Sequence, residues 1–253
     1  MATIIAVSNQ KGGVGKTTTT ANLGSALFQL GRRVLLVDMD PQANLTSAFG
    51  LSGQSEHSIA DCLLDRKVRP PVFNVGEDSS GRLDLIPSSI TLASTEAALM
   101  NKLGRELRLR DQLSAMSGQY DYVIIDTPPS LGLLTINALV AADKVIIPTE
   151  ARLFSLQGLQ MLQDSIEEIL YLNPKLEVLG VLLSKLDRRL KEEKLVSSYL
   201  RERWGTQMFQ TVIGTNSKIL EAASSGTSVF NYAGAEKAAD AYLALAREVL
   251  SRA

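Results

Sequence analysis

The sequence predicts a single α/β domain over residues 1–253, with a doubly wound, mostly parallel and twisted sheet of about seven to eight strands and helices on both faces. Short apolar runs alternate along the chain with stretches of helical periodicity, which is the order that right-handed βαβ crossovers require. Several of these runs lack polar alternation, as is typical of strands buried on both faces. The expected strands are 3–8, 34–38, 83–87, 122–126, 144–148, 178–184 and 211–213.

The expected helices occupy the segments between these strands: 16–30, 58–64, 92–100, 105–116, 133–141, 156–171, 191–204, 217–224 and 235–251. Residues 66–82 contain Pro and Gly without a period, so we expect an irregular surface connection there. Ligands of doubly wound sheets bind at the carboxyl ends of the strands. Three polar motifs follow strands at such ends, and they are 9–20, 38–44 and 126–130.

The composition excludes several classes of function. A net charge of −1 provides no global basic field, so DNA binding would require a local patch. The single cysteine, Cys62, excludes an internal disulfide, and the single histidine, His57, leaves no basis for histidine catalysis or a zinc site. The amino terminus lacks a charged signal-peptide region, and no apolar stretch approaches the ~18 residues of a membrane span. We therefore expect a cytoplasmic protein.

The first motif is a glycine-rich turn between a strand and a helix, Asn-Gln-Lys-Gly-Gly-Val-Gly-Lys-Thr-Thr-Thr-Thr over residues 9–20. Such a turn directs backbone N–H groups and a helix N-terminus at a phosphate, while Lys16 adds a charge and the Thr17 hydroxyl can hold Mg²⁺. A plain tight turn would not require two lysines and a run of threonines. The motif therefore predicts nucleotide binding by Gly12, Gly13, Val14, Gly15, Lys16, Thr17 and Thr18.

The loop departs from the usual phosphate-binding pattern at one position. Gln10 stands where a glycine is normal, and a second lysine, Lys11, follows it. Lys16 already serves the nucleotide of its own subunit. The second lysine therefore raises the question of whose phosphates it serves.

Two further motifs place carboxylates at strand ends. Asp38 and Asp40 end an apolar run, and they serve either as turn formers before Pro41 or as a pair, one near Mg²⁺ and the other against an attacking water. Asp126 follows Tyr122-Val-Ile-Ile, a pattern similar to a Walker B strand whose carboxylate holds Mg²⁺ through water, although an aspartate can also simply cap a strand.

Together these segments resemble the ParA/MinD group of deviant Walker-type ATPases, which are P-loop NTPases. Lys-Gly-Gly-Val-Gly-Lys-Thr-Thr, Asp-Met-Asp-Pro-Gln-Ala-Asn and Ile-Ile-Asp-Thr-Pro-Pro-Ser match the group almost letter for letter. The likeness is nearest to short, chromosomal Soj-like ParA proteins. It covers nearly the whole chain and fades in residues 52–82 and after residue 214.

The resemblance implies a role for each matching residue. Lys11 looks like the signature lysine that reaches the partner's phosphates in an ATP sandwich dimer, and Lys16 like the lysine of the β- and γ-phosphates. Thr17 would ligate Mg²⁺ and Thr18 would contact the α-phosphate. Asp40 would orient the hydrolytic water next to the metal, Asp126 would be the Walker B carboxylate, and Asn216 would lie near the adenine. The implied activity is a Mg²⁺-dependent ATPase that is slow until a ParB-like partner stimulates it.

The resemblance also implies nonspecific binding of double-stranded DNA. Residues 186–203 carry six basic and four acidic side chains, which without the resemblance would indicate a solvated helix face. In the family, Arg189 and Lys218 match DNA-binding positions, and the dimer would associate with the nucleoid. The segment 214–223, Gly-Thr-Asn-Ser-Lys-Ile-Leu-Glu-Ala-Ala, keeps Asn216 but lacks the prolines and arginines usual there.

Three alternatives stay open at this point. The same cycle can position a cargo other than DNA, such as a carboxysome or a chemotaxis cluster. A metabolic P-loop enzyme, such as an amidoligase or a reductase iron protein, is a different class, and the latter needs interfacial cysteines. Membrane binding, as in MinD, needs an amphipathic C-terminal extension, whereas 235–251 is expected to pack on the sheet.

Overall fold

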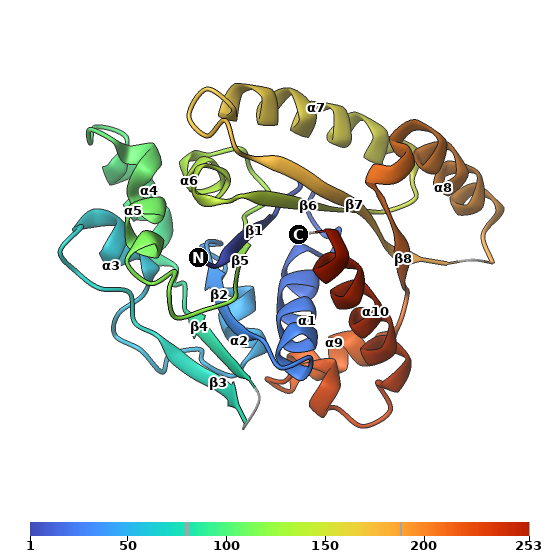
Figure 1. Ribbon diagram of the computed structural model, residues 1–253, viewed down its shortest axis with the longest axis horizontal. Helices are drawn as coiled ribbons and strands as arrows, with labels where there is room; N and C mark the ends of the chain where they lie inside the picture. Colours follow the sequence, from blue (N-terminus) through green and yellow to red (C-terminus); the bar gives the residue numbers. More distant parts are fainter. Residues whose placement is uncertain (79–80, 188, 253) are drawn as a thin grey trace.

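The computed structural model describes residues 1–78, 81–187 and 189–252, and its centre is one eight-stranded sheet (Figure 1). The spatial order of the strands is β3-β4-β2-β5-β1-β6-β7-β8, and all neighbouring pairs in the described ranges are parallel except β3 and β4. The predicted doubly wound sheet is therefore confirmed. The strands are β1 Thr3–Val7, β2 Arg33–Asp38, β3 Phe73–Glu77, β4 Arg82–Ile86, β5 Tyr122–Asp126, β6 Lys144–Thr149, β7 Glu177–Leu186 and β8 Met208–Gly214.

Helices cover both faces of this sheet (Figure 1). On one face lie α1 Lys16–Gln29, α2 Asn44–Ala48, α9 Ser217–Ser224 and α10 Glu236–Arg252. On the other lie α3 Ile59–Leu64, α4 Thr91–Leu99, α5 Arg108–Ser114, α6 Leu133–Ala141, α7 Leu153–Ile169 and α8 Lys191–Trp204. Single 3₁₀ turns occur at Arg105–Leu107, Gly205–Gln207 and Val229–Asn231.

The side chains of β2 show why the strands lack polar alternation. Val34 and Leu36 belong to the core with α1 and α10, whereas Leu35 and Val37 belong to the core with α3 to α6. Successive side chains of a strand point to opposite faces, so a strand covered on both faces is apolar throughout. On the first face, α10 buries Tyr242 against the sheet, which confirms that this helix packs as a closing element.

Two elements differ from the sequence prediction. The segment 66–82 was expected to be irregular, but Phe73–Glu77 forms β3, an antiparallel edge strand on β4 with a bulge next to Asn74. The Asn74 Nδ2 donates to Asp84 Oδ1 at 3.1 Å, so pairing with β4 overrides the weak local pattern. The second difference is α2, five residues long, which begins after Ala43 in the left-handed region at φ 52°.

The register brings the three polar motifs to one edge. Asp126 of β5 is level with Val7 of β1 on one side and with Asp38 of β2 on the other. The glycine-rich turn and the two aspartate motifs therefore leave adjacent strands at the same height. Within the described ranges, no helix is both long and apolar enough to span a bilayer.

Candidate functional site

The turn from β1 to α1 has the backbone of a phosphate cradle. Gly13 and Gly15 have φ angles of 77° and 89°, which residues with a Cβ rarely adopt. Gly15 immediately precedes α1, and no side-chain hydrogen bond from the described residues caps the helix there. The first N–H groups of α1 can therefore bind an anion.

Lys16 is directed into this cradle. The residue is only 7% exposed, and its Nζ donates to the backbone oxygen of Lys11 at 3.2 Å. Burial lowers the pKa of Lys16, while the charges of Asp126 and Asp40 act in the opposite direction. The buried Lys16 ammonium group is therefore positioned to bind a phosphate group that enters the cradle.

Asp38 and Asp126 form a buried pair at the ends of adjacent strands, and both are fully buried. Asp38 Oδ2 accepts hydrogen bonds from Thr46 N at 2.9 Å and Thr46 Oγ1 at 2.7 Å, and burial raises the pKa of Asp38 to about 6. Burial and the charge of Asp38 raise the pKa of Asp126 well above its ordinary value, although a Thr17 hydrogen bond opposes this.

One oxygen of this pair lacks a partner. Asp126 Oδ2 is buried and has no hydrogen-bond partner among the residues that the structure describes. An unpaired buried carboxylate oxygen is costly. Because carboxylate and hydroxyl oxygens are the ligands that Mg²⁺ takes, the Asp126 and Thr17 side chains fit a hydrated divalent cation.

The buried pair leads to a pH prediction for the metal-free protein. We expect Asp126→Asn to be more stable than wild type by about 1–2 kcal/mol near neutral pH, because it removes a charge that burial disfavours. The raised pKa means that folded wild type binds more protons than the unfolded chain, so its stability falls as the pH rises from about 4 toward the folded pKa. Urea unfolding in EDTA should show the advantage of the variant shrinking toward about pH 4; an advantage that grows there would contradict it.

Asp40 lies two residues after Asp38, in the loop that follows β2. It is 7% exposed, its Oδ1 accepts from Gln42 N at 2.9 Å, and its backbone oxygen accepts from Ser88 Oγ at 2.7 Å. Thr46 Oγ1 also accepts from Ser88 N at 3.0 Å. Sequence reasoning missed Thr46 and Ser88, which fix the loop that carries Asp40. The spacing alone left open which aspartate meets water, and the family resemblance assigned Asp40; the structure ties Asp38 to Thr46.

Lys11 lies at the outer lip of the loop with 32% of its side chain exposed. Its Nζ lies 3.3 Å from Glu150 Oε2, and its backbone N donates to Asn9 Oδ1 at 2.9 Å. Asn9 Nδ2 in turn donates to Pro148 O at 2.8 Å, which joins the loop to the end of β6. Sequence reasoning missed Asn9 and Glu150, because no local pattern marks them.

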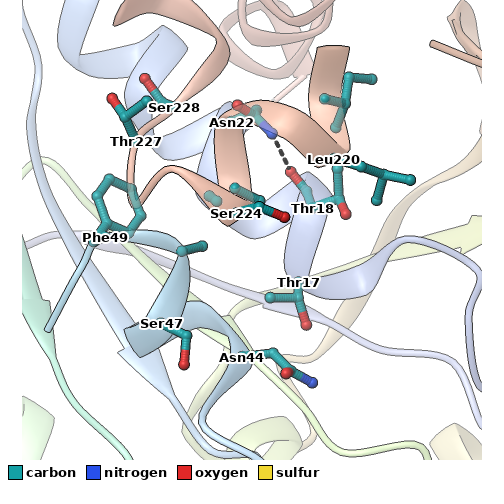
Figure 2. A pocket seen from close by; sticks show the side chains of 14 residues that line it. Thr17, Thr18, Asn22, Asn44, Ser47, Phe49, Leu220, Ser224, Thr227 and Ser228 are labelled. Carbon is teal, nitrogen blue, oxygen red and sulfur yellow. Dashed lines mark hydrogen bonds between the residues drawn. The ribbon is translucent and has the colours of Figure 1, made fainter. Parts of the chain in front are cut away.

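Two cavities adjoin the loop and share Thr18. The larger cavity has a volume of about 390 Å³. Figure 2 shows it where Thr17, Thr18 and Asn22 of α1 face α2 and α9. Within it, Asn22 Nδ2 donates to Thr18 O at 2.9 Å. The smaller, about 180 Å³, is lined by Gly15, Thr18, Lys185 and Asn216, among others. Asn216 Oδ1 accepts from Lys218 N at 3.0 Å and caps α9. Because Asn216 and Gly15 line the same cavity, the predicted adenine residue lies beside the cradle.

The two predicted DNA-binding residues lie on different elements. Arg189, just before α8, has a side chain that is 90% exposed and pairs with Asp187 at 2.7 Å. Lys218 of α9 pairs with Glu221 at 2.6 Å, and its Nζ lies 5.9 Å from the centre of the Tyr232 ring. Both cations are thus held by carboxylates of their own chain.

A doubly wound sheet with this loop and with carboxylates on the neighbouring strands defines a P-loop NTPase with a deviant Walker A loop. The AAA domain family matches residues 2–178, and the chain belongs to this family, together with the Soj and ParA proteins.

Three comparisons define the likeness. Sporulation initiation inhibitor protein Soj of Bacillus subtilis is 42% identical over 98% of this chain and 98% of its own length. Chromosome partitioning protein ParA of Caulobacter vibrioides is 42% identical over 98% of this chain and 94% of its own length. The structure of cobyrinic acid a,c-diamide synthase from Mycobacterium smegmatis, with bound ATP analog and magnesium, has a TM-score of 0.83 and 35% identity, covering 99% of this chain and 95% of that chain.

Proposed function

We propose that this protein is a Mg²⁺-dependent partitioning ATPase whose ATP-bound sandwich dimer binds DNA nonspecifically. A ParB-like or other adaptor protein would stimulate hydrolysis and release the dimer from the nucleoid. The observation that carries the proposal is the loop itself, with Lys16 buried in the cradle and Lys11 held at its outer lip. The 42% identity to Soj and ParA over nearly the whole chain supports it.

The residues of the cradle fit ATP and Mg²⁺. The N–H groups of residues 12–18 and the Lys16 ammonium would bind the phosphates, and Thr18 lies where the two cavities meet. Thr17, Asp40 and Asp126 would hold Mg²⁺, since the hydroxyl and the carboxylates lie at the same edge and Asp126 Oδ2 is unpaired. When bound, the cation neutralises phosphate charge and orients the phosphates. Asn216 would contact the base from the smaller cavity.

Hydrolysis requires mainly positioning and charge neutralisation from the protein. Asp40 is suited to orient a water, because Ser88 fixes the loop around it and, among the described residues, its carboxylate accepts one hydrogen bond, from Gln42 N. Asp38 is less suited to this role, since Thr46 donates twice to one of its oxygens. Lys11 would complete the site of the partner subunit.

DNA binding should depend on both ATP and salt. Arg189 and Lys218 supply few phosphate contacts per subunit, so binding is expected to be weak in a monomer and stronger when dimerisation doubles them. We expect retention on arbitrary duplex DNA with ATP at low salt but not with ADP. Retention should fall steeply as salt rises, and no ATP-dependent retention at low salt would contradict the proposal.

The residues can be tested with a matched control. The double variant Arg189→Ala/Lys218→Ala should lower DNA affinity about tenfold or more, with the ATP dimer unchanged. Lys102→Ala removes an exposed lysine just after α4, on the other side of the molecule from α8 (Figure 1), and should have no effect. Because Lys102→Ala removes one charge and the double variant removes two, a loss in Lys102→Ala about half that of the double variant on a logarithmic scale would assign the effect to overall charge.

The Mycobacterium smegmatis structure raises a second function, amide synthesis from a carboxylic acid. We favour the partitioning ATPase because Soj and ParA each share 42% identity with this chain over nearly its whole length, whereas the synthase shares 35%. ATP turnover that requires both an acid acceptor and an amide nitrogen donor would reverse this choice.

A further inference from the structure

Glu150 follows β6 at the lip of the phosphate loop, and three cationic side chains surround it. Its Oε2 lies 3.3 Å from Lys11 Nζ and 3.5 Å from Arg152 Nε, and its Oε1 lies 4.0 Å from Lys185 Nζ. The Glu150 side chain is 15% exposed, whereas those of Lys11, Arg152 and Lys185 are 32%, 64% and 49% exposed. The carboxylate is therefore the inner member of a cluster with surplus positive charge.

We propose that Glu150 is a positioning residue that retains Lys11 on its own subunit until the partner's nucleotide replaces it. This inference rests on the proposed ATP dimer. Assembly of that dimer must then exchange one anion for another: the Glu150 carboxylate releases the Lys11 ammonium, and the phosphates of the partner take it.

The backbone around Lys11 allows this exchange without refolding the loop. Lys11 N donates to Asn9 Oδ1, and Asn9 Nδ2 donates to Pro148 O, two residues before Glu150. Lys16 Nζ also donates to the Lys11 backbone oxygen. The main chain of Lys11 is thus fixed to the end of β6 and to the cradle, and only the side chain has to rotate.

The exchange would also help the site to distinguish ATP from ADP. A triphosphate presents more negative charge at the lip than a diphosphate, so it competes better with a single carboxylate for the ammonium. With ADP the Glu150 carboxylate keeps Lys11. Glu150 would therefore raise the threshold for dimerisation and keep the ADP-bound protein monomeric.

Arg152 weakens the hold of Glu150 on Lys11. Its Nε approaches the same oxygen, Oε2, that Lys11 approaches. Arg152 therefore competes with Lys11 for this carboxylate. Removing Arg152 should strengthen the hold of Glu150 on Lys11, whereas removing the charge of Glu150 should release Lys11.

The test is the dimer dissociation constant measured by sedimentation in a non-hydrolysable ATP analogue with Mg²⁺. Because two ion pairs break per dimer, Glu150→Gln should lower this constant about fivefold, and Arg152→Gln should raise it about twofold. The control is Glu177→Gln, which makes the same charge change at an exposed glutamate. Glu177 is the first residue of β7 and pairs with Lys144, and its replacement should leave the dimer dissociation constant unchanged.

Each outcome has a defined meaning. The inference is overturned if the dimer dissociation constant of Glu150→Gln is unchanged or raised relative to that of Glu177→Gln. It is also overturned if the dissociation constant of Arg152→Gln is lowered. Arg152→Gln keeps Glu150, so it tests the inference even where Glu150→Gln folds poorly. In a Lys11→Ala background, Glu150→Gln should not change analogue binding to the monomer; a change there would mean a structural role and would also overturn it. A wild-type protein that stays monomeric with the analogue contradicts the proposed function instead.

Discussion

Lys11→Ala should bind ATP nearly as well as wild type but fail to form the ATP dimer. The cradle for the nucleotide bound by the same subunit consists of Lys16 and the backbone of residues 12–18. Lys11 contacts Lys16 through its backbone oxygen and not through its side chain. We therefore expect the ATP affinity of the monomer to change by less than about threefold, equivalent to well under 1 kcal/mol.

The dimer should respond far more strongly. Removal of one partner of a buried charge pair at an interface costs about 2–5 kcal/mol, and a twofold dimer contains two such pairs. The dimer constant should weaken by at least about a thousandfold, beyond the range of ordinary sedimentation. Stimulated ATPase activity and DNA retention should be lost with it.

The control for this experiment is the other lysine. Lys16 is buried in the cradle, so Lys16→Ala should lose nucleotide binding itself. Fluorescent ATP titration separates the two variants from each other, and sedimentation separates both from wild type. A Lys11→Ala protein that still dimerises with ATP would refute the assignment of Lys11 to the partner's phosphates.

The phosphate loop and its carboxylates could be predicted because their information is local. Residues 9–15 lie between β1 and α1, and Asp38 and Asp126 end strands whose apolar runs are continuous. Parallel strands then place those ends at one edge. The bounds of β5 agree with the prediction, while other strand boundaries differ by up to three residues, because a ladder extends as far as its neighbours pair, as β8 does from Met208 to Gly214 along β7.

The remaining features depend on contacts between distant parts of the chain. Lys11 and Glu150 are 139 residues apart, and only the pairing of β1 with β6 brings them together. Ser88 supports Asp40 from 48 residues away. The edge strand β3 carries too short a pattern to identify by itself, and it forms because β4 is there to pair with it. No sequence period encodes such contacts.

Asp40→Ala should accumulate the ATP dimer by preventing its breakdown. Among the described residues the Asp40 carboxylate accepts one hydrogen bond, from Gln42 N, while Asp38 is fully buried and accepts two from Thr46. Loss of a residue that orients or deprotonates the attacking water lowers turnover by about a hundredfold to ten-thousandfold. Thr17 and Asp126 remain to hold Mg²⁺, and both lysines stay in place, so ATP binding and dimer assembly should persist.

The expected pattern is specific enough to separate this role from simple damage to the loop. Asp40 Oδ1 accepts from Gln42 N, so Asp40→Ala also removes a loop contact, whereas Asp40→Asn keeps an oxygen for that hydrogen bond. Both variants should dimerise with ATP, remain monomeric with ADP, and stay bound to DNA after wild type has released. If the two variants hydrolyse ATP at the wild-type rate, or if neither accumulates the dimer, Asp40 does not position the water and the choice between Asp38 and Asp40 must be reversed.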